Sequence, residues 1–483
     1  MTPNAVNWSL AIPEIGLALS GLLILVIGVL QKRGEGFFSC ATLTIAAFIG
    51  CGFLVALSPD GVAYAGTFVN DSFARFMKEL ALVGGLLATV VTVGYQGEAR
   101  GTHAPLPFET PILMLFSTLG AMIMASSGNL MTLFVGLELS SLSIYILCAL
   151  ERDNVRSSEA GLKYFVLGSL ASGLLLYGMS LIYGYAGTMD YAGLLTAIGS
   201  EESPPLGLMV GIVFVVVGLC FKLSAVPFHM WTPDVYQGAP TPVTAYMASA
   251  PKFAAFALFL RVMTGPFGTM APRWQILVEV VSLLSMVYGA LAAIPQTDIK
   301  RLMAYSSIGH MGYAMMGLAS ASAAGVRATL IYLAAYLVMN AGVFAVIATM
   351  QRKGHEVTTI ADLAGLGRRE PGLAAALAIF MFSMIGVPPL AGFFGKFMVF
   401  AAAWQSHLYA LVAIGALSSI VGAYYYLRIV KVLYFEESAE AFDPPATTLL
   451  FVTGGMSAAT VLFILALGPL MTVAQHAAQA LVG

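Results

Sequence analysis

Long apolar runs separated by short polar connections dominate the chain from end to end. A helix needs about 20 consecutive apolar residues to cross the hydrocarbon core of a bilayer. On that scale the sequence predicts fourteen spans, at 10–30, 37–57, 73–93, 108–126, 130–149, 160–184, 206–226, 241–263, 274–294, 300–319, 325–349, 372–403, 407–433 and 447–473. Because the connections are short, we expect an all-α integral membrane protein in which residues 1–483 form a single membrane domain.

The N-terminal run, Leu10–Leu30, has neither a basic segment before it nor a small-residue cleavage site after it. Both features are typical of a secretory leader. We therefore expect this run to be a retained membrane helix.

Composition excludes several classes of protein. Only 10% of the 483 residues are charged and 59% are hydrophobic, whereas a soluble domain has about 25% charged residues. A soluble enzyme, a secreted disulfide scaffold and a disordered chain are therefore excluded. The net charge is −2 and no basic surface is evident, so we expect no nucleic-acid partner.

Cofactor-binding patterns are also missing from the sequence. Each of the four cysteines lies singly inside an apolar run, at Cys40, Cys51, Cys148 and Cys220. Zinc and iron–sulfur sites need closely spaced cysteine ligands, so we interpret these four as small buried apolar side chains. There is no glycine-rich dinucleotide turn and no phosphate-binding loop. We expect no cofactor and no metal in this chain.

The lysines and arginines of the connections predict the orientation in the membrane. Cytoplasmic loops are enriched in these residues. With each loop numbered by the span before it, the odd loops contain thirteen: Lys32, Arg33, Arg100, Arg152, Arg156, Lys300, Arg301, Arg352, Lys353, Arg368, Arg369, Arg428 and Lys431. The even loops contain three, Arg261, Arg273 and Arg327, and also the acidic segment with Asp190, Glu201 and Glu202. The odd loops are thus predicted to be cytoplasmic, with both termini on the opposite side.

The remaining basic residues of the chain lie within predicted spans: Arg75, Lys78, Lys163, Lys222, Lys252 and Lys396. Arg75 and Lys78 lie within a turn of a helix start, so we expect them to reach the interface along their own side chains. A charged residue deeper in a span is costly and is typical of an ion or substrate pathway.

Proline residues near these deep lysines predict broken helices. Lys222 precedes Pro227 by five residues, Lys396 follows the Pro388–Pro389 pair by eight, and Lys252 directly follows a proline. Proline interrupts a helix, and interrupted helices at membrane depth line protein-enclosed, hydrated cavities. The breaks at Pro227 and at Pro388–Pro389 are five spans apart, which predicts two inverted five-helix repeats. We expect these repeats at 108–263 and 274–433, each with one broken helix, and flanking helices in 1–93 and 447–483.

Glu138 is predicted to be the only acid deep inside a span, so it should be protonated or paired. Lys222 and Lys163 are its candidate partners, although Lys163 is close enough to a helix start to reach the interface. A carboxylate beside a buried amine stabilises the ammonium form, so moving the carboxylate would change the lysine's proton affinity. His229 and His310, near span ends, are candidate relays. This set favours proton handling, with structural ion pairs or a Na⁺ site as the alternatives.

Five stretches of the sequence resemble one protein family, and the resemblance covers nearly the whole chain. They are GLELSSLSIYIL, EAGLKYFVLGSLASGLLLYG, FKLSAVPFHMWTPDVYQGAPTPVTAYMASAPK, TDIKRLMAYSSIGHMGY and GVPPLAGFFGKF. The chain resembles subunit N of bacterial proton-pumping NADH–quinone oxidoreductase (respiratory complex I), one of its three antiporter-like subunits. FHMWTPDVYQGAPTPV is specific for the antiporter-like group, and EAGLKYFVLGS together with lysine at 396 favours subunit N within it. His229 and His310 match motif positions whose roles are less certain.

The resemblance implies roles for the deep charges. Glu138 and Lys222 would be the ion pair of the first half-channel, Lys252 the connecting lysine, and Lys396 the terminal lysine of the second half-channel. Lys163 would be a further membrane lysine tied to the pair. Quinone reduction elsewhere in the complex would then be coupled to proton movement along this axis.

The resemblance also implies the setting of the chain. NADH, FMN, iron–sulfur clusters and quinone would be bound by other subunits, and the partners would be peripheral and membrane subunits, including sister antiporter-like subunits, with lipid around them. The location would be the bacterial inner membrane, with both termini periplasmic. The alternative is a subunit of a multi-chain Na⁺/H⁺ antiporter of the same fold, which the WTPDVY stretch does not distinguish. A purely structural scaffold is disfavoured by the cost of four buried charges.

Overall fold

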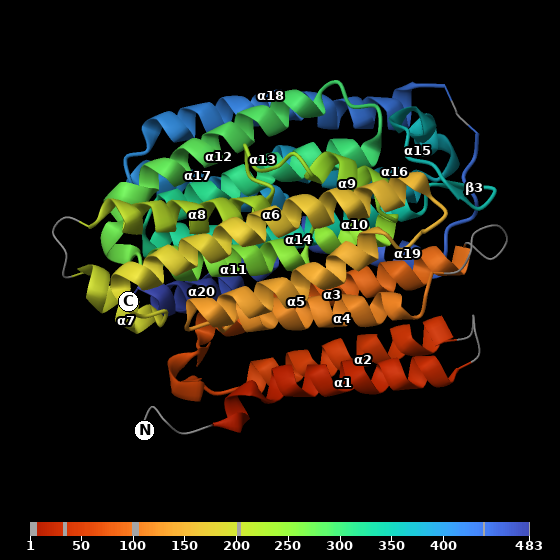
Figure 1. Cartoon of the computed structure of the whole chain (residues 1–483). Helices are drawn as coiled ribbons and strands as arrows, with labels where there is room; N and C mark the ends of the chain where they lie inside the picture. Colours follow the sequence, from red (N-terminus) through yellow and green to blue (C-terminus); the bar gives the residue numbers. More distant parts are fainter. Residues whose placement is uncertain (1–6, 32–35, 99–105, 200–203, 438–439, 483) are drawn as a thin grey trace.

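The structure, a computed structural model, describes residues 7–31, 36–98, 106–199, 204–437 and 440–482. Most helices lie side by side with roughly parallel long axes, and the two termini lie at the same end of the molecule (Figure 1). We call this end the terminal end. The opposite end contains β3 (Gln351–Arg352), paired antiparallel with β4 (His355–Glu356), and we call it the β3–β4 end.

Helices account for nearly all of the described chain. The elements of the first half are α1 (Ile12–Leu30), α2 (Gly36–Leu57), β1 (Gly61–Ala63), β2 (Phe68–Asn70), α3 (Ser72–Glu98), α4 (Glu109–Ala125), α5 (Leu130–Cys148), α6 (Val155–Ala186), α7 (Tyr191–Gly199), α8 (Leu206–Leu223), α9 (Thr232–Gly238), α10 (Thr241–Met247) and α11 (Ala250–Thr264). The second half contains α12 (Ala271–Ala293), α13 (Ile299–Ala319), α14 (Ala323–Ala348), α15 (Leu366–Arg369), α16 (Pro371–Ile385), α17 (Ala391–Gln405), α18 (Tyr409–Phe435), α19 (Thr447–Val461) and α20 (Phe463–Val482). Short 3-10 turns occupy Trp8–Ala11, Tyr64–Gly66, Gly268–Met270 and Ile360–Leu363.

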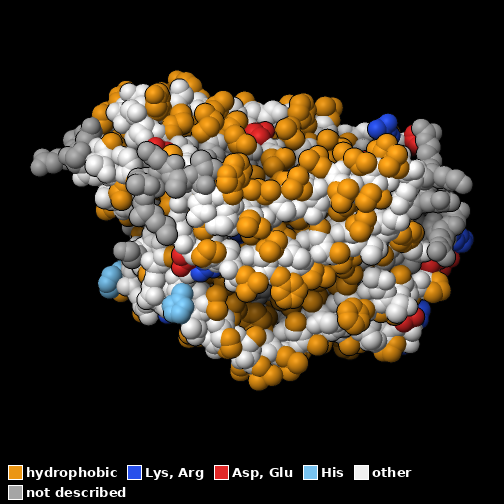
Figure 2. All heavy atoms as spheres, turned by 90° about the horizontal axis from the view of Figure 1, so that it is seen from below, with side chains coloured by type: hydrophobic (Ala, Val, Ile, Leu, Met, Phe, Trp, Pro, Cys, Tyr) orange, Lys and Arg blue, Asp and Glu red, His pale blue; other side chains and the backbone are white. Residues whose placement is uncertain are grey.

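The predicted membrane architecture is confirmed. Within the described ranges, eleven helical segments are long and apolar enough to cross a membrane, and three shorter apolar helices accompany them. Hydrophobic side chains are spread over the whole of the face that Figure 2 shows, with few charged ones among them, and Leu23 of α1 and Phe53 of α2 are more than half exposed. An apolar exterior of this kind suits lipid rather than water.

Helix ends differ from the predictions at several places. The span predicted at 241–263 is two helices, and the interruption comes before Pro251, which occupies the first turn of α11, where a missing N–H costs nothing. The last predicted span, 447–473, extends to Val482 as α19 and α20. The short helix α7 and the β1–β2 hairpin were not predicted, because neither has an apolar run long enough to stand out.

One prediction about buried charge is wrong. Lys78 does not reach the interface; its side chain is fully buried and its Nζ lies 2.6 Å from Glu14 Oε1, with Asn70 Oδ1 at 3.0 Å. Its partner Glu14 is only 6% exposed and lies in the first turn of α1, so it is buried near a helix end and not deep inside a span. Arg75 does lie near the helix end, where it bonds Asp60 and the Ser58 carbonyl.

The basic residues of the predicted loops form different contacts in the described chain. Basic residues in 152–156, 300–301 and 428–431 lie near helix ends, and Lys300 bonds Glu356 of β4 at the β3–β4 end. Arg261 and Arg327 bond Asp71 and Gln475 instead, and Arg273 lies in the first turn of α12. Lys32, Arg33 and Arg100, and the acids Glu201 and Glu202, lie outside the described residues.

The helices α10, α11 and α14 lie at the centre of the bundle. In both the α10–α11 segment and α14, 94% of the most apolar 18 residues are buried. Small residues let neighbouring helices approach closely: a Cβ atom built on Gly120 of α4 would lie 2.6 Å from the Gly136 carbonyl oxygen of α5. The polar groups described next lie around this centre.

Candidate functional site

The first helix break lies between α8 and α9. The helix ends at Leu223, and Ser224 adopts a left-handed conformation with φ 62°. The freed backbone groups find side-chain partners: Val226 N–H donates to Ser285 Oγ at 2.9 Å, and Trp231 Nε1 donates to the Phe221 carbonyl at 3.1 Å. Lys222 therefore lies in the last turn of a helix, where the negative end of the helix dipole favours a cation.

Lys222 is half-buried and bonds neutral groups of α5. Its Nζ donates to Ser141 Oγ at 2.8 Å and to Tyr145 OH at 3.1 Å. Glu138 lies on the same face of α5, because spacings of three and four residues place helical side chains above one another. Glu138 Oε1 accepts from Ser172 Oγ of α6 at 2.5 Å. Within the described ranges no ion pair shorter than 4.0 Å involves Glu138, so the two groups expected to pair bond different hydroxyls, Lys222 that of Ser141 and Glu138 that of Ser172.

Lys163 lies apart from Glu138. Its side chain is 40% exposed, and its Nζ lies 2.7 Å from both Glu159 Oε1 and Asp234 Oδ2. Asp234 also accepts from Arg301 at 2.6 Å through its other oxygen. Sequence reasoning missed Asp234 and Arg301, although the WTPD and TDIKR stretches that contain them had already been singled out.

Lys252 is buried in the first turn of α11. Its Nζ donates to Ser307 Oγ of α13 at 2.5 Å, and Tyr336 OH of α14 donates to the same oxygen at 2.8 Å. The ammonium also lies 5.2 Å from the centre of the Tyr236 ring. With no acid among these contacts, Lys252 is held by hydroxyl groups and an aromatic face.

His310 lies farther along α13 and is 3% exposed. Its Nδ1 is 2.6 Å from Tyr332 OH, and its Nε2 is 3.1 Å from Tyr426 OH. The Tyr426 hydroxyl is in turn 2.5 Å from Ser306 Oγ. The histidine is thus bonded on both ring nitrogens to tyrosine hydroxyls, in an arrangement that could exchange a proton.

Lys396 lies at the second helix break. The helix α16 ends where Gly386 takes φ 99°, and the Pro388–Pro389 pair separates it from α17. The carbonyls of a helix end lack intrahelical partners, and Lys396 Nζ, on the second half-helix, occupies them: it donates to Met384 O and Ile385 O, both at 2.9 Å, and to Ser419 Oγ at 2.8 Å.

A small internal cavity joins His310 to Lys396. It has room for about one water molecule, and its polar lining is provided by Ser306, His310, Tyr313, Lys396, Ser418, Ser419, Tyr425 and Tyr426. The Tyr313 ring lies 4.8 Å from the Lys396 ammonium. The side chains of α13 at 306, 307, 310 and 313 therefore form a polar row between Lys252 and Lys396.

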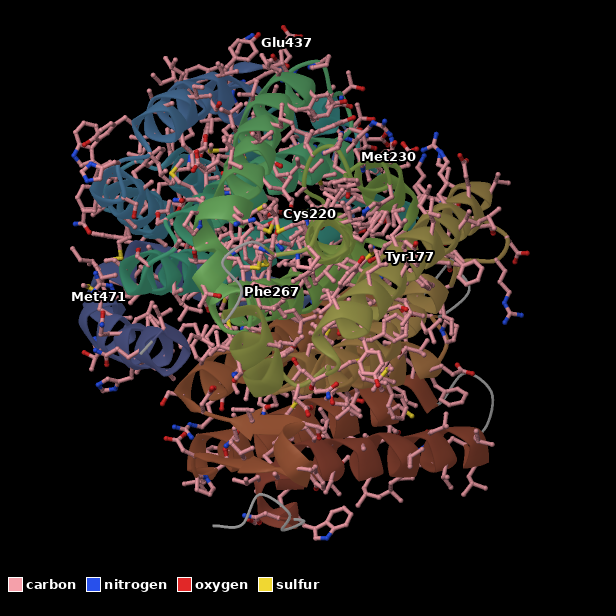
Figure 3. The ribbon with its side chains drawn as sticks, turned by 60° about the vertical axis from the view of Figure 1, so that its left-hand side comes forward. Tyr177, Cys220, Met230, Phe267, Glu437 and Met471 are labelled. Carbon is pink, nitrogen blue, oxygen red and sulfur yellow. The ribbon has the colours of Figure 1, made fainter. Side chains whose placement is uncertain are left out.

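His229, the other candidate relay, is not part of this row. It lies in the first break, half-buried, with its ring 4.6 Å from that of Tyr288, and its buried Nδ1 has no hydrogen-bond partner within the described residues. The four cysteines are buried and none forms a disulfide; Cys220 lies in the interior of the bundle, whereas Tyr177 and Met471 lie at its periphery (Figure 3).

Comparison with known proteins agrees with this arrangement. The profile of the family described as NADH:quinone oxidoreductase/Mrp antiporter, transmembrane, matches residues 127–422. The chain is 67% identical over 476 residues to NADH-quinone oxidoreductase subunit N of Gluconacetobacter diazotrophicus, across 98% of this chain and 99% of that protein. It is 52% identical over 480 residues to subunit N of Rhodospirillum rubrum, across 98% and 97%.

Solved structures share the fold. A chain of respiratory complex I from Thermus thermophilus with bound aureothin matches with a TM-score of 0.79 and 30% identity, covering 95% of this chain and 99% of that one. A chain of the Mrp complex from Dietzia matches with a TM-score of 0.83 at 24% identity, covering 99% and 98%, a likeness of fold alone. The chain belongs to the subunit N family of NADH-quinone oxidoreductase, within the antiporter-like membrane proteins.

Proposed function

We propose that the chain translocates protons along a path through Glu138, Lys222, Lys252, His310 and Lys396, as a membrane subunit of NADH-quinone oxidoreductase. The observation that supports this path most strongly is the polar row of α13, which connects two deep lysines through hydroxyl and imidazole groups. Each lysine of the path bonds neutral oxygen atoms in the described structure. A lysine held in this way can give up a proton without leaving a buried carboxylate unpaired.

The resemblance of the chain to the family tied Lys163 to the Glu138–Lys222 pair, and we propose a different role for it. It bonds Asp234 rather than Glu138, so we infer that it acts on the path through α9. Lys222 and Glu138 would then exchange protons through Ser141 or an intervening water, since Glu138 and the two hydroxyls that bond Lys222 lie on one face of α5. His229 would lie outside this path, since its ring packs against Tyr288 beside the first break.

The rest of the complex provides the redox chemistry in this proposal. NADH, FMN, the iron–sulfur clusters and quinone would be bound by other subunits, and this chain would add no redox site of its own. It would assemble with sister antiporter-like subunits in the bacterial inner membrane, with both termini periplasmic and the β3–β4 end cytoplasmic. The segments 108–263 and 274–433 would act as inverted repeats, each contributing one broken helix to the path.

The Na⁺/H⁺ antiporter alternative has weaker support. Its solved relative, the Mrp complex, shares the fold at 24% identity, whereas several NADH-quinone oxidoreductase subunits N are about half identical or more over nearly the whole chain. The family relation therefore favours a translocating subunit of a redox complex.

Replacement of Lys222 by alanine tests the proposal. In inverted membrane vesicles we expect NADH-driven proton uptake to fall while the assembled complex is retained. Lys431→Ala is the matched control, because Lys431 is 68% exposed and bonds only a surface glutamate. Unchanged NADH oxidation and proton uptake in Lys222→Ala, together with loss of Na⁺/H⁺ exchange, would overturn the proposal in favour of the antiporter.

A further inference from the structure

The two-turn helix α9 stands directly between the Lys222 break and the β3–β4 end of the molecule. It is too short to be stable by itself, so its position depends on contacts with its neighbours. Its start is attached through Trp231, whose ring stacks on Tyr164 of α6 at 4.2 Å. Its end is attached through the Ala239 carbonyl, which accepts from Lys300 of α13 at 2.6 Å.

Asp234 joins α9 to both flanking helices at once. One carboxylate oxygen is 2.7 Å from Lys163 Nζ on α6, and the other is 2.6 Å from Arg301 Nη1 on α13. The Arg301 guanidinium also donates to Gln237 of α9 at 3.2 Å. A single acid thereby connects a helix of the first half of the chain to a helix of the second half.

Both cations have a second partner. Lys163 also contacts Glu159, and Arg301 also contacts Gln237. All three groups of the network are about one-third exposed or more, so water reaches them. Neutralising Asp234 should consequently loosen α9 without leaving an unpaired charge in a dry interior.

Aromatic contacts connect α9 to the site of Lys222. Trp231, immediately before α9, donates to the Phe221 carbonyl beside Lys222 and stacks on Tyr164. The Tyr164 ring packs edge-on against Tyr145 at 4.8 Å. Tyr145 in turn provides one of the two hydroxyls that bond Lys222. A displacement of α9 would therefore change the surroundings of Lys222 in two ways, through the Phe221 carbonyl and through the Tyr145 hydroxyl.

We propose that Asp234 is a positioning residue for Lys222: its two ion pairs fix α9, and the Trp231–Tyr164–Tyr145 stack carries that position to the hydroxyl group that Lys222 bonds. The inference rests on the proposed function, since it assumes that Lys222 transfers protons. It adds a requirement that the carboxylate at 234 remain charged and paired on both sides.

The test compares Asp234→Asn with Asp234→Glu in inverted vesicles that contain the assembled complex. We expect the asparagine variant to lower NADH-driven proton uptake severalfold and to shift its pH profile, while NADH oxidation by the complex persists. The glutamate variant should restore much of the uptake, because its carboxylate can reach the same two cations. Asp362→Asn is the matched control: Asp362 forms a similar partly exposed pair with Arg352 at the same end, away from Lys222.

Two results would overturn the inference: proton uptake in Asp234→Asn with the wild-type amplitude and pH profile, or an assembled glutamate variant that pumps no better than the asparagine variant. If Asp234→Asn does not assemble, Lys163→Met removes one of the two pairs at a more exposed position and should still lower uptake. Wild-type uptake in that variant would also overturn it. Failure of the proposed function is distinguished by Lys222→Ala, which would then pump normally.

Discussion

Replacing Lys396 by methionine removes the ammonium at the second helix break and retains an unbranched apolar side chain of similar length. We expect the variant complex to assemble and to oxidise NADH, and we expect NADH-driven proton uptake to fall. The physical reason is that the path would lose its last proton-accepting group, while the volume at position 396 stays filled.

The expected cost in stability follows from the bonds that Lys396 makes. The wild-type ammonium bonds Met384 O, Ile385 O and Ser419 Oγ. Without it, Ser419 Oγ, which already lies 3.4 Å from Ile385 O, can keep that carbonyl paired. One carbonyl, Met384 O, is then left without a partner, at a cost of about 1–3 kcal/mol. A loss of this size is compatible with a folded and assembled subunit.

The free energy of the bonds around Lys396 can be compared with the work needed to move a proton across the membrane. Carrying one charge across 100 mV costs about 2.3 kcal/mol. A hydrogen bond from a charged donor contributes about 1.5–3 kcal/mol. Breaking or forming one of the three bonds around Lys396 is therefore comparable to the electrical work of the step, and no rearrangement of whole helices is needed.

The assay compares inverted vesicles from wild type, Lys396→Met and the surface control Lys431→Met, normalised to the amount of assembled complex. NADH oxidation, quinone reduction and the fluorescence quench of a ΔpH-sensitive dye are measured together. Wild-type proton uptake in Lys396→Met would refute the role of this lysine in the path. Loss of assembly would refute the stability argument and indicate that the lysine is structural.

Two further predictions concern packing and an ion pair outside the spans. Gly392→Ala should reduce the amount of assembled complex, measured by blue-native electrophoresis, because the added methyl group would overlap the Ser383 carbonyl; overpacking of this kind costs about 1–3 kcal/mol. Gly372→Ala, which meets open space, should have no effect, and equal losses in both would contradict the packing argument. Burial raises the pKa of Glu356, but the Lys300 ammonium at 2.8 Å, together with hydrogen bonds from Thr241 and Tyr95, outweighs burial and holds that pKa below its usual range. The pair therefore stabilises the protein above the ordinary glutamate pKa and loses this effect as pH falls through the lowered value. Glu356→Gln should reduce thermal stability at pH 7, and the deficit should shrink in acid; a deficit independent of pH would contradict this assignment.

The sequence predicted the features that depend on local chemistry. Spans follow from the length of apolar runs, and the breaks beside Lys222 and Lys396 follow from Pro227 and from the Pro388–Pro389 pair. The helix ends beside Lys222 and Lys396 could thus be predicted from the prolines near them in the sequence. The deep placement of Lys252 was also predicted, although the interruption before it falls earlier than its proline.

Partners across the bundle could not be predicted in the same way. The hydroxyls that surround His310 come from Tyr332 and Tyr426, which lie within apolar runs of two other helices, α14 and α18. A tyrosine in such a run is equally compatible with a lipid interface or with a core. The Glu14–Lys78 pair was missed for the same reason, because each residue lies near a helix end, where contact with water is the simpler expectation.

The polar row of α13 has a consequence for ion selectivity. None of the residues that line the cavity between His310 and Lys396 is acidic, and its polar groups are hydroxyls, one imidazole and one amine. A proton can pass such groups by exchanging bonds, since hydroxyls and imidazole both donate and accept, and the lysine accepts once it has given up its proton. A sodium ion would have to shed its hydration water beside a lysine and would find no carboxylate there to replace it. A lining with a lysine and no carboxylate would therefore admit protons and exclude sodium ions through its chemistry rather than through its width.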